Sequence, residues 1–91
     1  MIALYPGTFD PITNGHFEII RRASTLFGDL VVGVAKSPEK NPLFSLDQRL
    51  EMVNEVLNSF NNIEVAAYDG LTINFAKSIE ARVIVRGLRS P

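Results

Sequence analysis

The chain has 91 residues, of which 46% are hydrophobic and 21% are charged, so it is long enough for one small globular domain. Nine basic and ten acidic residues give a net charge of −1, which excludes a general electrostatic attraction to nucleic acid or to an anionic membrane. The absence of cysteine, with only one histidine present, excludes disulfides, thiolate chemistry and an ordinary Cys/His zinc site.

We expect no secretory signal peptide at the N-terminus. Residues 1–7 lack the basic start and the long apolar core of a secretory signal. No apolar run in the sequence approaches the roughly 20 residues that a membrane-spanning helix needs. We therefore expect a cytoplasmic protein with neither a membrane nor a nucleic acid as partner.

The first predicted strand covers residues 2–5, and a helix follows the polar loop after it. The apolar stripe expected on this helix consists of Ile19, Ile20, Ala23, Leu26 and Phe27. Gly28 comes directly after the stripe, where a residue in the left-handed conformation often ends a helix.

The second predicted strand covers residues 30–35, and the helix after it begins at Ser45. Ser45 and Gln48 have the spacing of a capping box. The third strand covers residues 63–67 and precedes a shorter helix, which we expect Thr72 to cap. The inward side chains expected on the two helices are Leu46, Leu50, Val53 and Leu57 on the first, and Phe75, Ala76 and Ile79 on the second.

The last predicted strand covers residues 82–85 and completes an alternation of four strands with three helices. This order indicates right-handed βαβ units in a Rossmann-like, doubly wound parallel sheet of the α/β class. The second and fourth strands are nearly continuous in apolar residues, so we expect both to be buried on two faces. Because the chain ends at Pro91 with no helix to cover the fourth strand, we expect residues 1–91 to be the N-terminal part of a longer domain.

The unusual polar residues follow the predicted strands. Ligands of an open parallel sheet bind outside the carboxyl ends of its strands. The loops at these ends contain His16, Lys36, Lys40, Arg86 and Arg89. Cations next to glycines and a helix N-terminus are what polyphosphate binding requires. Neither a P-loop nor a G-x-G-x-x-G segment is present, and no Ser or Cys nucleophile is flanked by a base, so catalysis would depend on positioning and electrostatics.

Each of these residues also has an ordinary structural interpretation. Gly7 and Thr8 could simply form a turn, since Pro-Gly is a common turn pair. Asp10-Pro11 could likewise initiate a turn, and for this pair we prefer the turn. A lone histidine is most often structural; in the first turn of a helix, however, the dipole favours a neutral imidazole, which can donate one N–H to a phosphate. The lysines and arginines of the loops could be solvated surface charges, although two arginines within four residues suit bidentate phosphate contacts.

One extended string is highly specific. The residues Tyr-Pro-Gly-Thr-Phe-Asp-Pro-Ile-Thr-Asn-Gly-His at positions 5–16 contain the T-x-G-H form of the (T/H)-x-G-H motif of the nucleotidyltransferase superfamily. The full string resembles the bacterial phosphopantetheine adenylyltransferase family in particular. Ser37-Pro38 with Lys40, Gly70-Leu71-Thr72 and the segment 85–89 are similar to that family in order and spacing. The similarity covers the whole chain, which stops a little past the midpoint of the family's enzymes.

The resemblance implies a reaction. ATP and 4′-phosphopantetheine would give dephospho-coenzyme A and pyrophosphate in coenzyme A synthesis, with Mg²⁺ as cofactor and a homo-hexamer as the assembly of the whole enzyme. The family's later acidic residue and Ser-rich segment, which contact ATP, have no counterpart within these 91 residues.

The resemblance also implies the site residues. The catalytic residues would be His16, Lys40 and Arg89, and no residue is expected to bind a metal directly. Phosphopantetheine would contact Thr8, Lys40, Thr72 and Arg86, with Thr72 acting mainly through its backbone. ATP would contact Thr8, Phe9, His16, Gly87, Leu88 and Arg89.

Three alternatives remain open from the sequence. The same superfamily includes nucleotidyltransferases that use nicotinamide mononucleotide or glycerol phosphate as the acceptor. The chain could instead be a module that binds a nucleotide without turnover. It could also be a structural α/β fragment that folds only within an oligomer.

Overall fold

The computed structural model describes residues 1–36 and 41–87 of the chain. The strands are β1 (Ile2–Gly7), β2 (Asp29–Ala35), β3 (Ile63–Tyr68) and β4 (Val83–Ile84). The helices are α1 (Asn14–Leu26), α2 (Leu46–Val56) and α3 (Thr72–Ser78). The strands alternate with the helices, which confirms the α/β class and the element order predicted from the sequence.

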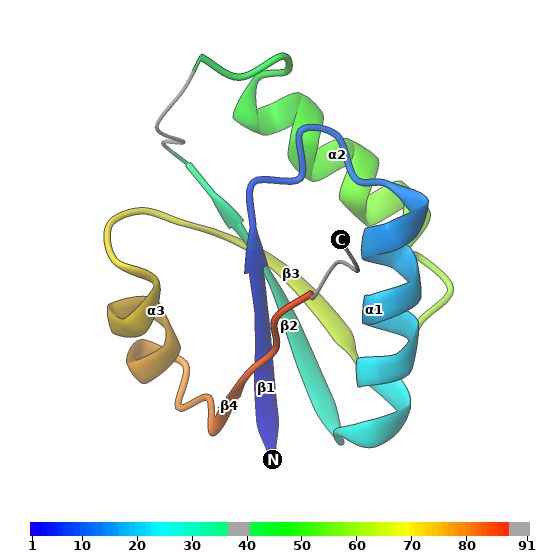
Figure 1. Cartoon of the computed structure of the whole chain (residues 1–91), viewed down its shortest axis with the longest axis vertical. Coiled ribbons are helices and arrows are strands. Elements are labelled where there is room, and N and C mark those ends of the chain that lie inside the picture. The colour runs from blue at the N-terminus through cyan, green and yellow to red at the C-terminus, as the bar shows by residue number, and fades with distance from the viewer. Residues whose placement is uncertain (37–40, 88–91) are drawn as a thin grey trace.

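All four strands belong to one parallel sheet with the order β3-β2-β1-β4. The chain moves from β1 outward to β3, then returns across the sheet to place β4 on the other side of β1 (Figure 1). This reversal at β1 is the point at which open α/β sheets usually bind ligands. The Rossmann-like, doubly wound sheet is therefore confirmed.

The helices cover both faces of the sheet. Helices α1 and α2 lie on one face and α3 lies on the other (Figure 1). The larger core, under α1 and α2, includes Ile20, Val32 and Val53, each with 0% of its surface exposed. The smaller core, under α3, contains Leu4, Val31 and Ala76. None of the helices in the described residues combines the length and the apolarity needed to cross a bilayer.

The two strands predicted to be buried on both faces differ. In β2, residues Leu30 to Val34 are all buried, as expected for a central strand. In β4, only two residues pair with β1, and Ile84 is 37% exposed. The prediction was wrong for β4 because this strand lies at the edge of the sheet, where one face is only partly covered by α3.

The helix ends show which local signals hold. The predicted capping box at the start of α2 is confirmed, because Ser45 and Gln48 exchange side-chain and backbone hydrogen bonds. Two expectations about α1 were wrong. Leu26, expected in the apolar stripe that faces the core, is 76% exposed. Gly28 was expected to end the helix in the left-handed conformation, but the C-cap is Phe27 in extended conformation and Gly28 has no positive φ. The predicted cap of α3 was also wrong, since Leu71 is the N-cap and Thr72 is the first helical residue.

Candidate functional site

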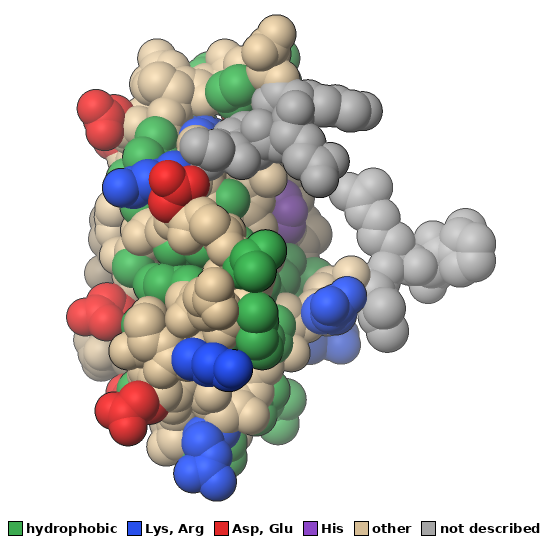
Figure 2. Space-filling model, turned by 90° about the vertical axis from the view of Figure 1, so that its left-hand side faces the viewer, with side chains coloured by type: hydrophobic (Ala, Val, Ile, Leu, Met, Phe, Trp, Pro, Cys, Tyr) green, Lys and Arg blue, Asp and Glu red, His purple; other side chains and the backbone are tan. Residues whose placement is uncertain are grey.

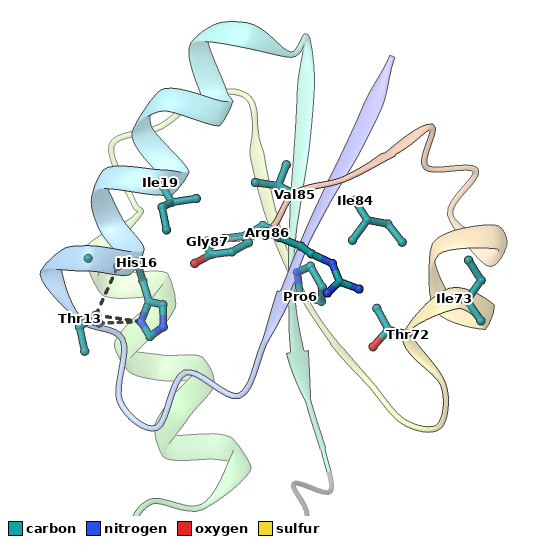
Figure 3. A pocket seen from close by; sticks show the side chains of 12 residues that line it. Pro6, Thr13, His16, Ile19, Thr72, Ile73, Ile84, Val85, Arg86 and Gly87 are labelled. Atoms are coloured by element: carbon teal, nitrogen blue, oxygen red, sulfur yellow. Dashed lines mark hydrogen bonds between the residues drawn. The ribbon is translucent and has the colours of Figure 1, made fainter. Parts of the chain in front are cut away.

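A pocket of about 760 Å³ opens at the carboxyl end of β1, where the sheet order reverses. Its wall comes from four segments: the end of β1, the start of α1, the start of α3, and the end of β4 with the residues after it. Figure 3 shows His16 on one side, Thr72 and Ile73 on the opposite side, and Arg86 between them. The topology therefore gathers the loops to which the sequence assigned the phosphate-binding residues.

His16 is held by the first turn of α1. Thr13 and His16 form a capping box in which the Thr13 Oγ1 accepts from the His16 backbone N–H at 3.3 Å. The backbone N–H of Thr13 donates to His16 Nδ1 at 3.0 Å. Because a backbone amide can only donate, Nδ1 must be the unprotonated nitrogen, so the neutral ring carries its proton on Nε2. The helix cap thereby makes Nε2 a hydrogen-bond donor on the ring edge that lines the pocket.

Aromatic packing fixes the plane of the imidazole. The Phe9 ring lies edge-on to His16, with centroids 4.8 Å apart, and edge-on to Tyr5, with centroids 5.6 Å apart. Phe9 is only 2% exposed and adopts a positive φ of 51°, which costs energy for a residue with a Cβ. A Cβ at Gly7 would lie 3.0 Å from the Phe9 ring, so glycine at position 7 permits this placement.

The opposite side of the pocket offers one cation and few polar side chains. Arg86 is exposed and lines the pocket together with Gly87. Thr72 also lines it, and its hydroxyl is held by a hydrogen bond of 2.9 Å with the hydroxyl of Tyr68. A ligand on this side would therefore meet the Arg86 guanidinium and Thr72.

Two sets of polar contacts, from the buried Arg49 and from the half-buried Asp10, join the loops near the pocket. Arg49 is 1% exposed and donates to the backbone carbonyls of Thr8, Ala35, Lys36 and Phe44 over 2.8–3.3 Å. The carboxylate of Asp10 accepts from the backbone N–H groups of Leu43 and Phe44 at 2.6 Å and 2.8 Å. The turn preferred for Asp10-Pro11 is present, but the carboxylate also connects the loop after β1 to the segment before α2.

The structure brings only some of the predicted site residues together. His16, Thr72, Arg86 and Gly87 line the pocket. Thr8 and Phe9 lie in the loop after β1 and do not line the pocket. Because the Phe9 side chain is buried, only the backbone of this residue could contact a nucleotide. Lys36 is exposed outside the lining. Lys40, Leu88 and Arg89 lie outside the described residues.

Tyr5, Arg49 and Asp10 are residues of the site region that sequence reasoning missed. Tyr5 lines the pocket but reads as the last apolar residue of a strand. Arg49 reads as a solvent-facing residue of a helix, and its partners lie between 5 and 41 residues away in the sequence. Asp10 had a local explanation as a turn residue. Only the position of Tyr5 at a strand end gave a usable signal.

The electrostatics of the pocket favour an anion. Among the lining residues in positions 1–36 and 41–87, none is Asp or Glu, and Arg86 contributes a positive charge. Figure 2, viewed from the side of α3, shows acidic side chains along the edge of the view away from the histidine. Within the described part of the chain, no cluster of three or more His, Cys, Asp or Glu is placed to hold a metal ion. The donors fit phosphate oxygens and do not fit a protein-held Mg²⁺, which prefers carboxylates.

A family model described as cytidylyltransferase-like matches residues 4–91. The chain belongs to this family. The pocket at the sheet reversal and the motif string at positions 5–16 thus lie in the part of the chain that the family model covers.

Curated relatives of this cytidylyltransferase-like chain confirm the resemblance predicted from its motifs. It is 55% identical over 89 residues to a phosphopantetheine adenylyltransferase of Carboxydothermus hydrogenoformans, covering 98% of this chain and 55% of that protein. It is 56% identical over 88 residues to a phosphopantetheine adenylyltransferase of Helicobacter pylori, covering 97% of this chain and 56% of that protein. The chain spans about half the length of the curated relatives it matches.

Solved structures support the fold alone. The lipopolysaccharide core biosynthesis protein of Thermoplasma volcanium matches with a TM-score of 0.72 at 22% identity, covering 92% of this chain and 71% of that one. A bifunctional NMN adenylyltransferase/ADP-ribose pyrophosphatase of Francisella tularensis matches with a TM-score of 0.57 at 20% identity, covering 86% of this chain and 24% of that one.

Proposed function

We propose that the protein to which this chain belongs transfers an adenylyl group from ATP to 4′-phosphopantetheine, giving dephospho-coenzyme A and pyrophosphate. The two relatives that are 55% and 56% identical to this chain are named phosphopantetheine adenylyltransferases, which supports this assignment. The single structural observation that carries it is the pairing of His16 and Arg86 in one pocket at the sheet reversal. A donor from α1 and a cation from the segment after β4, both lining one pocket, suit two phosphorylated reactants.

The reaction places two anions side by side. At a separation of about 4 Å, two unit negative charges repel by about 4 kcal/mol at an effective dielectric of 20. Arg86 offsets this repulsion from the side of α3, and the His16 Nε2–H donates to a phosphate oxygen from the side of α1. The rest of the barrier is lowered by holding the attacking phosphate in line with the α-phosphate of ATP.

The pocket requires no general base. A phosphate oxygen of phosphopantetheine is already anionic at neutral pH and can attack without losing a proton. The P–O bond to pyrophosphate breaks as the new P–O bond forms, and the negative charge leaves with pyrophosphate. The Nδ1 atom of His16 already accepts from the Thr13 backbone N–H, so the ring is suited to donating from Nε2 and not to removing a proton.

Several parts of the proposal extend beyond the described pocket. Lys40 would hold the attacking phosphate, while Leu88 and Arg89 would contact the ATP phosphates. Thr8 and Phe9 would contact the nucleotide, Thr8 would also contact the phosphopantetheine phosphate, and Gly87 would let ATP approach the backbone closely. Mg²⁺ would arrive with ATP as part of the substrate, since none of the described residues that line the pocket carries a carboxylate. A cytoplasmic homo-hexamer completes the proposal for the whole enzyme.

The experiment is an acceptor-specific assay of the purified chain. MgATP is offered with 4′-phosphopantetheine, nicotinamide mononucleotide or glycerol phosphate, and pyrophosphate and the nucleotide product are quantified. We expect pyrophosphate and dephospho-coenzyme A in equal amounts with phosphopantetheine alone. Turnover with another acceptor would reassign the substrate. ATP binding without pyrophosphate release would instead make the chain a nucleotide-binding module.

A further inference from the structure

Tyr5 presents a hydroxyl that the fold does not use. The residue is only 5% exposed, and its ring packs edge-on against Phe9. Within the described part of the chain, no hydrogen bond involves its hydroxyl. In the same residues, no side-chain oxygen or nitrogen that is sealed from solvent lacks a partner. The Tyr5 Oη must therefore reach the surface of the pocket that the residue lines.

The position of this hydroxyl is defined by its neighbours. A Cβ at Gly87 would lie 3.3 Å from Tyr5 Oη, so the hydroxyl lies close to the backbone that follows β4. The Tyr5 and His16 ring centroids are 6.4 Å apart. These neighbours place the hydroxyl on the α1 side of the pocket. Thr72 lines the α3 side (Figure 3).

Burial also determines the protonation state of the group. Loss of hydration raises the pKa of Tyr5 above its ordinary value, so the hydroxyl keeps its proton throughout the neutral range. A protonated phenol can donate to an anionic oxygen, and none of the described residues that line the pocket carries a competing carboxylate. An unused, mostly buried donor costs desolvation energy, which a ligand acceptor would recover.

We propose that Tyr5 Oη donates a hydrogen bond to an oxygen of the bound nucleotide, between His16 and Gly87. The inference rests on the proposed function, which puts ATP on the α1 side and phosphopantetheine beside Arg86 and Thr72. Tyr5 would then be a substrate-binding residue that works with His16 on the same reactant.

The test is Tyr5→Phe, which removes the hydroxyl and keeps the ring packed against Phe9. ATP and 4′-phosphopantetheine are titrated separately into the parent chain and the variant by calorimetry, and the melting temperature is measured without ligand. We expect ATP affinity to fall about tenfold or more, because a hydrogen bond to a charged oxygen is lost. Phosphopantetheine affinity and the melting temperature should stay unchanged.

Tyr68→Phe is the matched control. Its hydroxyl bonds Thr72 inside the protein, and Tyr68 does not line the pocket. This variant should melt a few degrees lower while its ATP affinity stays within about twofold of the parent value.

Three outcomes would overturn the inference. Equal ATP affinity of the parent chain and Tyr5→Phe would contradict the proposed hydrogen bond, even if the proposed function stands. A loss of affinity confined to phosphopantetheine would assign the hydroxyl to the other reactant. A melting temperature lowered as far as in Tyr68→Phe would give the hydroxyl a role in the fold. The proposed function fails separately, and with it the inference, if the parent chain binds no ATP.

Discussion

At the scale of single residues, His16 combines a structural and a chemical task. Its Nδ1 accepts from the Thr13 backbone at the start of α1, while its other edge lines the pocket. The ring is further held by the edge of Phe9. A substitution at position 16 therefore changes both the helix cap and the site, and the two effects have to be separated by choosing two variants.

His16→Gln retains an acceptor for the capping box, whereas His16→Ala removes it. We expect kcat of the catalytically active protein to fall by about 10²–10³ in both variants, with a much smaller rise in KM, because a donor aimed at developing charge is lost or displaced. Only His16→Ala should also lose about 1 kcal/mol of stability in urea denaturation. A rise in KM with kcat unchanged would reassign His16 to ground-state binding.

Lys40 gives a second prediction at this scale, one that rests on the family resemblance. Lys40→Ala should weaken phosphopantetheine binding while leaving ATP binding nearly intact, since the lysine would neutralise the attacking phosphate. Calorimetric titration with each substrate separately measures both effects. The reverse pattern, with ATP binding lost and phosphopantetheine binding kept, would contradict the assigned role.

At the scale of secondary-structure elements, Arg49 connects α2 to the ends of β1 and β2. Its guanidinium donates to the backbone carbonyls of Thr8, just after β1, and of Ala35, the last residue of β2. The loop that leads to His16 and the segment after β2 are thus tied to one buried cation.

Arg49→Met keeps much of the side-chain volume and removes the donors. We expect the free energy of unfolding to fall by about 3 kcal/mol or more, because buried carbonyls are left unsatisfied. Arg82→Met serves as the control, since Arg82 is exposed, and should change stability by less than about 0.5 kcal/mol. Urea denaturation measures both; a loss no larger than that of the control would show that water replaces the guanidinium.

The same scale shows what the sequence could and could not predict. Ser45 and Gln48 were predictable as a capping box because both partners lie within one turn of the chain. Thr72 could also cap a helix with its hydroxyl, but this hydroxyl forms a hydrogen bond with the hydroxyl of Tyr68 instead of the expected N-cap bond. Arg49 could not be assigned at all, since its carbonyl partners come together only when β1 and β2 are already paired.

The candidate site was predictable to the extent that topology determines it. The rule that ligands bind at strand ends placed His16 and Arg86 in one pocket, 70 residues apart in number, before any distance was known. It did not separate residues that line the pocket from those behind it. Thr8 and Phe9 fall in the second group because the chain turns inward after Gly7.

At the scale of the whole molecule, the pocket joins segments from both halves of the chain, and a ligand should stabilise them together. We expect saturating ATP to slow amide hydrogen exchange at residues 13–16 and 85–87, two segments that contribute to the pocket lining. Exchange at residues 61–64, beside the amino ends of β2 and β3, should change much less because they lie at the other end of the sheet. Protection that is uniform along the chain would point to global stabilisation without binding at this pocket.

The short pairing of β4 has a consequence for changes in chain length. Only Ala3 with Val83 and Leu4 with Ile84 set the register of this strand. Deleting a single residue between α3 and β4 would exchange the sheet faces of Val83 and Ile84, since neighbouring side chains of a strand point to opposite sides. It would also draw Arg86 back by about 3.3 Å along the strand axis, away from the opening. The connection at residues 80–82 should therefore tolerate exchanges of side chain far better than insertions or deletions.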